Sequence, residues 1–499
     1  MSFSRIYAAQ PHLLKGKIVT IEVDITPNTL HAFTLVGLPD KAVDEAKDRM
    51  SSALKNSGFN SPKNQNQKVV ISLSPADLKK EGAYFDLGIA LSYLFSAREI
   101  NFEPEGKIFL GELSLNGELR PIKGALPLAQ EAKKLGYKEI FLPFQNANEA
   151  GLVDGIVIYG AKTLREVIDH ISIRRVNKKG EFLDPEKPKI IPQEKTKVER
   201  KEKNHTIDFS DIRGQEGAKR GLEIAAAGGH NVAMSGPPGT GKTMLARVFS
   251  HILPELDHDD ILEITGIHSI VGNLEDNLVT EPPFRSPHHT ASYVSMIGGG
   301  TNPKPGEVTL AHKGVLFLDE FPEFEKRVLE SLRQPLEDNI VSISRARGSA
   351  IFPSNFILIS AMNPCPCGHK GDKKKMCICK PSDLDRYNRR LSGPIMDRID
   401  IWVTVGAVDY DKLSSEGVTG EKTNTIKERV KKAREIQEKR FKKVSQSGGR
   451  KIKTNSEMNV KELGIFAPLT QEVKEILNQS AERLQLSARA YHRTIKLAR

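Results

Sequence analysis

The sequence has few cysteines, no long apolar run and no secretion signal. Its four cysteines all lie between positions 365 and 379, which argues against a disulfide framework and favours a local metal site. No run of about 18 apolar residues occurs, so no membrane-spanning helix is expected. Residues 1–5 lead into strand-like sequence without the apolar core of a signal peptide. We therefore expect a cytoplasmic protein that does not enter the membrane.

The balance of charge is strongly basic. The 499 residues include 74 Lys and Arg against 63 Asp and Glu, which gives a formal net charge of +11. A basic balance favours a polyanionic partner, nucleic acid first, although many basic proteins bind none. The length predicts two or three domains, and a composition of 38% hydrophobic and 27% charged residues is typical of globular proteins.

Residues 236–243, Gly-Pro-Pro-Gly-Thr-Gly-Lys-Thr, fit the pattern of a phosphate-binding loop in full. A short apolar strand is expected before the loop and a helix after it, which is the context that this motif requires. Backbone N–H groups of the loop can surround phosphates, while Lys242 reaches the β- and γ-phosphates and Thr243 holds Mg²⁺. The residues predicted to bind ATP are Gly236, Pro237, Pro238, Gly239, Thr240, Gly241, Lys242 and Thr243.

Two later apolar strands end in polar side chains. The strand at 314–318 ends in Asp319 and Glu320, which fits the Walker B role: Asp319 would complete the Mg²⁺ shell and Glu320 would polarise the attacking water. The strand at 356–362 ends in Asn363, an amide placed to sense the γ-phosphate or the water. An ordinary strand followed by a helix cap is the alternative, and the agreement of independent parts of one site argues against it.

The cysteines form two C-x-C pairs joined by nine residues rich in lysine and glycine, and they are Cys365, Cys367, Cys377 and Cys379. Four thiolates suit tetrahedral Zn²⁺ in a structural site without an open position. The C-x-C spacing is less usual than C-x-x-C, so reduced free thiols and a redox pair stay open as alternatives, and His369 could replace one ligand. Lysines at 370 and 373–375 could contact phosphates, as in a DNA-binding finger.

Residues 1–170 alternate strands with helices and predict a mixed α/β domain. Residues 73–82, and a hairpin expected over 107–120 with an Asn-Gly turn at 116–117, resemble the proteolytic domain of Lon-type proteases. The Ser–Lys pair of those proteases is missing, because residues 83–86 read Ala-Tyr-Phe-Asp and residues 124–128 read Gly-Ala-Leu-Pro-Leu. A nucleophile without its base does little, so we interpret this domain as a non-proteolytic scaffold.

The order of phosphate loop, acid pair and strand-end Asn resembles an AAA+ ATPase. An insert at 284–305 and a hairpin expected over 336–345 resemble the magnesium chelatase subunit I-like branch. Together with the Lon-like front domain and the cysteines, nearly the whole chain resembles the YifB/ComM family of bacterial ATPases. The resemblance implies an α/β protein with an N-terminal Lon-like mixed α/β domain, an AAA+ core around a parallel sheet, and a helical C-terminal lid.

On this basis the chain divides into four parts. These are a Lon-like domain at 1–170, a solvated charged linker at 171–205, the AAA+ core at 206–408 with the cysteine insertion at 365–379, and the lid at 409–499. The linker is predicted from its polar, proline-bearing sequence, which lacks apolar periodicity. No cap signal ends the last helix at Arg499, and members of the family run on past this point, which suggests that the chain is truncated.

The resemblance also implies two arginines of the active site. Residues 392–400 match the segment that carries the arginine finger, so Arg398 would enter a neighbouring subunit's site and stabilise the transferring phosphoryl group. An Arg–Asp surface pair is the alternative. Arg489 matches the second-sensor arginine of the lid and would act in cis on its own nucleotide, with Arg493 one helical turn away as a further candidate. A finger that acts in trans implies an oligomer, by resemblance a hexamer.

The resemblance implies a ring motor that couples ATP hydrolysis to movement on DNA, with helicase or branch-migration activity during recombination of transforming DNA. Its cofactors would be ATP, Mg²⁺ and structural Zn²⁺, and Arg345, Arg347 and the cysteine loop are candidates for the DNA surface. The alternatives are a magnesium chelatase motor subunit, a protein-remodelling ATPase, an ATP-dependent protease, and an adaptor that binds ATP without turnover. The residues themselves support an ATPase more directly than a DNA-binding protein.

Overall fold

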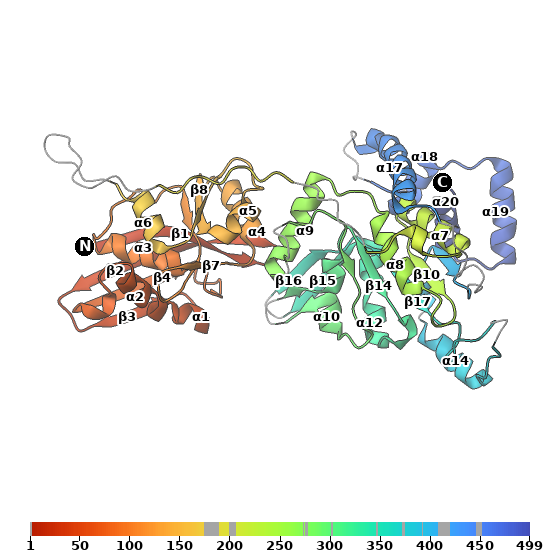
Figure 1. The fold of residues 1–499 in the computed structure, drawn as a ribbon, viewed down its shortest axis with the longest axis horizontal. Coiled ribbons are helices and arrows are strands. Elements are labelled where there is room, and N and C mark those ends of the chain that lie inside the picture. The colour runs from red at the N-terminus through yellow and green to blue at the C-terminus, as the bar shows by residue number, and fades with distance from the viewer. Residues whose placement is uncertain are drawn as a thin grey trace. The chain divides into compact units, whose positions relative to one another are not determined.

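The structure is a computed structural model that describes residues 2–173, 189–198, 206–272, 274, 278–300, 303–345, 348–371, 375–391, 393–407, 420–445 and 452–499. The chain forms two compact units (Figure 1). Unit 1 comprises Met1–Glu199 and Ile261–Val279, and unit 2 comprises Arg200–Asp260 and Thr280–Arg499. Among the described residues, none of the helices combines the length and the hydropathy that crossing a bilayer requires.

Unit 1 contains a four-stranded sheet of order β1-β2-β4-β3. The long strands β1 (Ser2–His12) and β2 (Lys15–Pro27) pair antiparallel, β4 (Gln67–Ser74) pairs antiparallel with β2, and β3 (Ala32–Val36) lies parallel to β4. Burial alternates along β4, so one face of the sheet packs on the core. Helix α3 (Asp86–Ser96) is buried nearly all round and packs against β1 and β2.

A second sheet of unit 1 is parallel, with the order β5-β8-β9. Its strands are β5 (Lys107–Phe109), β8 (Glu139–Pro143) and β9 (Val157–Ala161). The hairpin expected over 107–120 is therefore shorter and consists of β6 (Glu112–Leu113) and β7 (Leu119–Arg120). Strand β5 leaves the hairpin because it pairs with β8 instead.

The described part of the predicted linker, residues 189–198, is mostly exposed to solvent and is tied to unit 1 by backbone hydrogen bonds. The backbone N–H of Gln193 donates to the carbonyl of Ile158 on β9, and Thr196 is buried with its N–H on the carbonyl of Gly151. These backbone hydrogen bonds hold the segment on unit 1, and they cannot be predicted from its polar sequence. Residues 174–188 and 199–205 lie outside the described residues.

Unit 2 is organised around a five-stranded parallel sheet of order β11-β14-β17-β10-β18. The strands are β11 (Phe284–Arg285), β14 (Val315–Leu318), β17 (Ile357–Met362), β10 (Val232–Ser235) and β18 (Ile401–Thr404). Strands β10, β14 and β17 are buried almost throughout, as is typical of a parallel sheet covered on both faces. The carboxyl ends of its strands meet at one edge, where ligands of such sheets bind.

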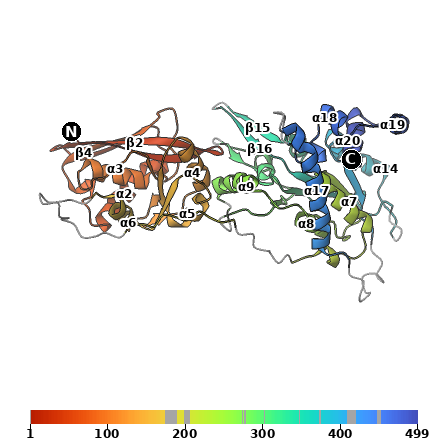
Figure 2. The ribbon, with the colours of Figure 1, turned by 90° about the horizontal axis from the view of Figure 1, so that it is seen from above.

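The C-terminal region is helical, as predicted, with α17 (Thr423–Ser445), α18 (Val460–Phe466), α19 (Gln471–Arg483) and α20 (Ala488–Ala498). Helix α17 packs beside α7 (Glu216–Gly228) and α8 (Lys242–His251) of the core (Figure 2). Helices α18 and α20 share a small apolar core with Phe441 and Met458. These findings confirm the α/β fold class with a parallel-sheet core and a helical C-terminal region.

The remaining elements connect these layers. In unit 1 they are α1 (Lys41–Asp44), α2 (Ala46–Asn56), α4 (Ala125–Lys134), α5 (Phe144–Ala150), α6 (Leu164–Ile171) and, from Ile261 onward, α9 (His258–Val271). In unit 2 they include α10 (Tyr293–Ile297), α11 (Glu307–Leu310), α12 (Lys326–Ser331), α13 (Arg333–Asp338), α14 (Pro381–Arg390) and α15 (Gly393–Met396).

The hairpin expected over 336–345 begins later than predicted. It consists of β15 (Ile340–Arg345) and β16 (Gly348–Pro353), because residues up to Asp338 complete α13 and Asn339 ends that helix in the left-handed conformation. Arg347 and the side chain of Arg345, both candidates for the DNA surface, lie outside what the structure describes.

Candidate active site

The phosphate loop joins β10 to α8 at the carboxyl edge of the sheet. Gly239 and Gly241 have φ angles of +76° and +87°, which glycine adopts without the steric cost that other residues carry. Gly236 is required for a different reason, because a Cβ there would lie 2.0 Å from the carbonyl oxygen of Val405. The loop therefore turns tightly where the sheet ends and α8 begins.

Lys242 is buried inside the loop. Its Nζ donates to the carbonyls of Gly236 and Pro237 at 2.7 and 2.8 Å, and to Oδ1 of Asn363 at 3.2 Å. Burial lowers the pKa of Lys242, and the charge of Asp319 opposes that effect. The ammonium thus lies between the phosphate loop and the end of β17. A bound phosphate there would replace these uncharged oxygens as the hydrogen-bond acceptor of Lys242.

Thr243 and Asp319 place two oxygens at one point. The hydroxyl of Thr243, at the start of α8, donates to Oδ2 of Asp319 at 2.8 Å, and Asp319 follows β14 directly. A hydroxyl and a carboxylate are hard oxygen ligands, and Mg²⁺ in nucleotide sites takes one or two protein oxygens together with phosphates and water. The pair therefore fits a magnesium ion.

Glu320 has a backbone conformation that is unusual for its residue type. Its φ and ψ are 51° and 42°, in the left-handed region, which a non-glycine residue adopts at a cost and often at functional sites. Its side chain is exposed, and Oε2 lies 3.0 Å from Nδ1 of His289. His289 also packs edge-on against Phe324. This contact could not be predicted from the sequence, because His289 belongs to the insert and not to either motif.

These residues line one cavity of about 650 Å³. Lys242, Thr243, Asp319, Glu320 and Asn363 all contribute to its wall, together with most of the phosphate loop. Further lining residues were not predicted, among them Tyr387 and, as part of this cavity, Cys365. The hydroxyl of Tyr387 on α14 donates to the carbonyl of Asn363 at 2.8 Å. No motif signals this contact, since α14 lies beyond the cysteines in the sequence.

Arg398 lies elsewhere and is ion-paired within its own chain. Its Nη2 binds Oε2 of Glu337 and its Nη1 the carbonyl of Pro394, and only 8% of its side chain is exposed. Arg398, through its hydrogen bond and its charge, lowers the pKa of Glu337, with a smaller effect from Arg489. The alternative of an Arg–Asp surface pair is not what the structure shows, because the partner is a glutamate and the arginine is buried.

Arg489 is predicted to act on its own nucleotide. In this structure its Nη2 binds the other oxygen of Glu337, beside Arg398, and neither arginine is among the described residues that line the cavity. Arg493, one turn further on, pairs with Asp400 at 3.0 Å and thereby fixes α20 near the start of β18.

The four cysteine sulfurs lie within 4.8 Å of one another. The Sγ of Cys365 is 3.4 Å from that of Cys367 and 3.7 Å from that of Cys377. Tetrahedral zinc with Zn–S bonds of about 2.3 Å separates its sulfurs by about 3.8 Å, so the group fits such an ion. Backbone N–H groups of His369 and Ile378 lower the pKa of Cys367 to about 6, whereas burial and the neighbouring sulfurs raise the pKa values of Cys377 and Cys379.

The lysines around the cysteines are described only in part. Residues 372–374, including Lys373 and Lys374, lie outside the described residues, whereas Lys370 and Lys375 are exposed. His369, proposed as an alternative ligand, is not part of the group of four sulfurs that the structure brings together.

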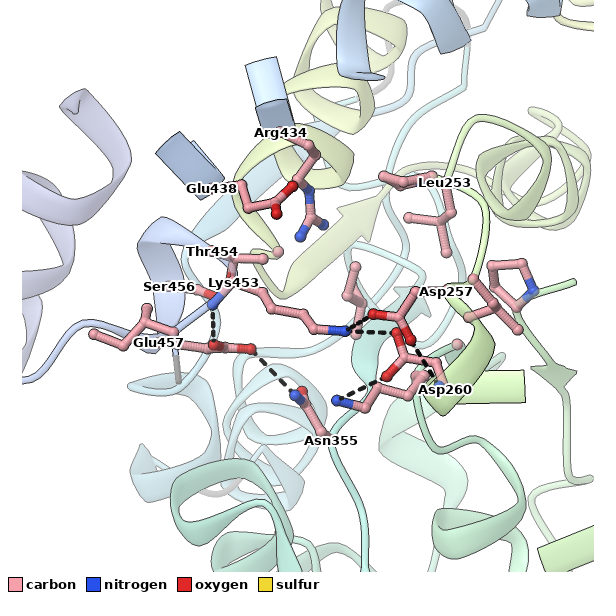
Figure 3. A pocket seen from close by; sticks show the side chains of 18 of the residues that line it. Leu253, Asp257, Asp260, Asn355, Arg434, Glu438, Lys453, Thr454, Ser456 and Glu457 are labelled. Atoms are coloured by element: carbon pink, nitrogen blue, oxygen red, sulfur yellow. Dashed lines mark hydrogen bonds and ion pairs between the residues drawn. The ribbon is translucent and has the colours of Figure 1, made fainter. Parts of the chain in front are cut away.

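A second cavity of about 500 Å³ lies between α17 and the amino-terminal edge of the sheet (Figure 3). Its charges are largely paired. Lys453, which precedes the short 3₁₀ helix η4 (Asn455–Glu457), binds Asp257 at 2.8 Å and Asp260 at 2.6 Å. Asn355, ahead of β17, donates to Glu457 at 3.2 Å. These contacts join the helical C-terminal region to the core.

Comparisons with known proteins agree with this architecture. Family models described as "Subunit ChlI of Mg-chelatase", "Magnesium chelatase, subunit ChlI" and "Magnesium chelatase, subunit ChlI C-terminal" match residues 21–146, 208–413 and 420–499. Over all of its length the chain is 40% identical to the competence protein ComM of Haemophilus influenzae, of which it covers 93%. The chain belongs to the ComM/YifB family.

The ComM/YifB family is confirmed by a second relative, the uncharacterized protein YifB of Escherichia coli, which is 40% identical over the whole chain and 93% covered. A partial match, 29% identical over 29% of this chain and 28% of the relative, is Lon protease 2 of Bacillus subtilis. The magnesium chelatase-like core of this ComM/YifB member is that of an AAA+ ATPase that uses ATP and Mg²⁺.

Proposed function

We propose that this ATPase is a ring-forming motor that moves on DNA and drives branch migration when transforming DNA recombines. The observation that carries the proposal is the 40% identity to a competence protein over the full length of both the front unit and the ATPase core. Competence is the uptake of DNA by a cell, and the net charge of +11 suits a polyanionic partner. The protein would act in the cytoplasm, where this DNA arrives.

In the proposed reaction the residues of the cavity share the work of hydrolysis. Lys242 would exchange its backbone acceptors for the β- and γ-phosphates, and Thr243 and Asp319 would hold a Mg²⁺ ion, which would supply neutralising charge. Glu320 accepts a hydrogen bond from the attacking water and aligns it with the γ-phosphorus. Asn363, which accepts a hydrogen bond from Lys242, would sense whether the γ-phosphate is present and pass this change on to β17.

Arg398 of one subunit would serve the cavity of the next, and Arg489 would act on its own nucleotide. Arg398 is ion-paired to Glu337 and does not line its own cavity, so the proposed active site is complete only when a second copy of the chain supplies it. Such head-to-tail contacts close into a ring, and the family resemblance suggests a hexamer. An arginine supplied in this way raises turnover by about 10³-fold or more.

The cysteine cluster would hold one structural zinc ion. Its four sulfurs have the spacing that tetrahedral zinc requires, and thiols stay reduced in the cytoplasm. Metal analysis of protein kept under reducing conditions should find about one zinc per chain. Finding none would leave a thiol or redox role for these cysteines.

The steady-state ATPase rate tests the motor directly, measured without DNA, with single-stranded DNA and with a branched duplex at moderate salt. We expect stimulation by DNA that disappears as salt rises, because phosphate contacts release counterions. A branch-migration assay on a four-way junction would follow. An ATPase rate that is the same with and without each of these DNAs would contradict the DNA motor but not the ATPase activity.

A second candidate is the motor subunit of a magnesium chelatase. All three matching family models carry that description. This function needs a large porphyrin-binding partner, so co-purification with such a protein and porphyrin-dependent ATPase activity would favour it over the DNA motor.

A further inference from the structure

The cysteine cluster lies directly against the proposed nucleotide cavity. Cys365 is fully buried and lines that cavity. Only Pro364 separates it from Asn363, whose side chain accepts a hydrogen bond from Lys242. The chain thus passes from the proposed phosphate contact, Asn363, to the first sulfur of the cluster within two residues, so a displacement of one is passed to the other through Pro364.

A second contact joins the cysteine segment to the phosphate loop. Gly368 has a φ angle of +82°, and a Cβ at this position would lie 2.7 Å from Cδ of Pro238. Pro238 belongs to the loop and lines the cavity. The turn after Cys367 therefore packs on the loop so closely that even a methyl group would force the two apart.

The far end of the segment returns to the same point. Helix α14 begins at Pro381, two residues after Cys379, and its Tyr387 is largely buried with its hydroxyl on the carbonyl of Asn363. Asn363 is therefore held from both sides, through Cys365 by the chain and through Tyr387 by a hydrogen bond.

The segment between these anchors has almost no core of its own. Of its described residues, 365–371 and 375–379, only Cys365 and Gly368 are buried, while Met376 and Ile378 are 89% and 83% exposed. Backbone N–H groups point at the sulfurs, from Cys367 to Cys379 and from Lys370 to Cys365, as around metal-bound thiolates. Ligation of a metal ion is thus the interaction available to order a segment that cannot bury apolar surface.

We propose that the metal ion of the cysteine cluster supports the nucleotide site, so that zinc and Mg·ATP bind this chain cooperatively. The inference rests on the proposed nucleotide and zinc sites and adds a coupling between them. Zinc orders residues 365–371 and 375–379, these residues hold Asn363 and Pro238, and these two positions shape the place of the phosphates. By linkage, ATP must then raise the affinity for zinc by the same factor by which zinc raises the affinity for ATP.

Both directions can be measured on the full chain without DNA. The affinity for a fluorescent, non-hydrolysable ATP analogue with Mg²⁺ is compared between zinc-loaded protein, protein stripped with a zinc-selective chelator, and stripped protein to which zinc is returned. We expect about a tenfold loss on stripping and recovery with zinc. The rate at which zinc passes to a competing chelator is expected to fall by a similar factor when the analogue is bound.

Two variants separate coupling from folding. Tyr387→Phe removes the hydroxyl that holds Asn363, and Gly368→Ala pushes the segment off Pro238, yet neither touches a sulfur. Each should keep one zinc per chain while reducing the coupling factor severalfold. Met376→Ser, an exposed change in the same segment, is the matched control and should keep the full factor.

The outcomes are distinct. Equal affinity for the analogue with and without zinc, with unchanged circular dichroism, would overturn the coupling but not the ATPase. Failure of the zinc-loaded chain to bind the analogue at all would overturn the nucleotide site itself. If the zinc-stripped protein unfolds, the two variants decide the question. A coupling factor in Tyr387→Phe and Gly368→Ala equal to that of the unmodified chain would overturn the proposal.

Discussion

Arg398 is ion-paired to Glu337 of its own chain, and this carboxylate also binds Arg489. One glutamate thus gathers both arginines that family resemblance assigns to nucleotide hydrolysis, at a place from which neither lines its own cavity. A neighbouring subunit's nucleotide would have to compete with Glu337 for Arg398. The proposed trans role of Arg398 can be tested by mixing subunits.

Mixing two inactive variants should restore turnover if Arg398 acts in trans. Lys242→Ala should abolish nucleotide binding, and Arg398→Ala should bind ATP but lose about 10³-fold in turnover. In mixed rings a Lys242→Ala subunit still donates Arg398 to an Arg398→Ala neighbour, so ATPase activity should reappear. Arg483→Ala, an exposed change on α19, serves as the control. A mixture that exchanges subunits and stays inactive would refute the trans role.

Glu320→Gln should bind ATP and fail to hydrolyse it. The amide keeps the shape of the side chain but cannot accept a proton from water, so turnover should fall by about 10²- to 10³-fold with little change in ATP affinity. Glu323→Gln, a glutamate in the same cavity that pairs with Arg390, is the matched control and should hydrolyse ATP nearly normally. Ordinary turnover by Glu320→Gln would remove the Walker B assignment.

ATP affinity should fall as the pH rises, and the fall should begin at a lower pH than it would with a lysine of ordinary pKa. Burial lowers the pKa of Lys242, and ATP binds the protonated form, so affinity is constant below this pKa and falls as the pH rises through it. The window lies below about pH 10.4, the usual lysine value. Calorimetry in buffers of different ionisation enthalpy should also detect proton uptake on binding in this window.

Lys242→Arg is the control for this pH dependence, because its guanidinium stays charged throughout. Its ATP affinity, although weaker, should be flat over the same range. Identical pH profiles for the lysine and arginine proteins would show that another group titrates.

Lys453→Met should loosen the attachment of the helical C-terminal region to the core. The ammonium pairs with Asp257 and Asp260 in a partly buried position (Figure 3), and its removal leaves two neighbouring carboxylates without a partner. Since the pairs are partly exposed, we expect a loss of about 1–2 kcal/mol in denaturant unfolding of this region. Lys431→Met, on the exposed face of α17, should change it by less than about 0.5 kcal/mol. Equal losses of unfolding free energy in Lys453→Met and Lys431→Met would contradict a role for Lys453 in attaching this region to the core.

Much of this architecture could be predicted from short stretches of sequence. Apolar runs such as 315–318 and 357–362 become buried parallel strands, because a sheet covered on both faces has no polar side. Since parallel strands end at one edge, Asp319 and Asn363 had to lie near the phosphate loop, and the structure places them there. The parallel-sheet core was predicted correctly on this basis, and the family was predicted correctly from the resemblance of the motifs.

Other predictions failed where long-range contacts compete with local pattern. The stretch 107–109 reads as part of a hairpin, yet it pairs with β8, which lies beyond a whole helix. Residues 189–198 are mostly exposed, as a linker should be, but the backbone hydrogen bonds of Gln193 and Thr196 to unit 1 were not foreseen. A polar sequence does not reveal which backbone groups will find partners.

The sequence by itself determined the chemistry of the cavity: the glycines of the loop, one lysine, two carboxylates and an amide at the ends of strands. These depend on spacing within a motif, where backbone geometry leaves little choice. Only the tertiary structure decided that Arg489 meets Glu337, that His289 holds Glu320, and that Cys365 lines the same cavity as Lys242. Those pairs join segments far apart in the chain, and side-chain packing, which no local pattern encodes, brings them together.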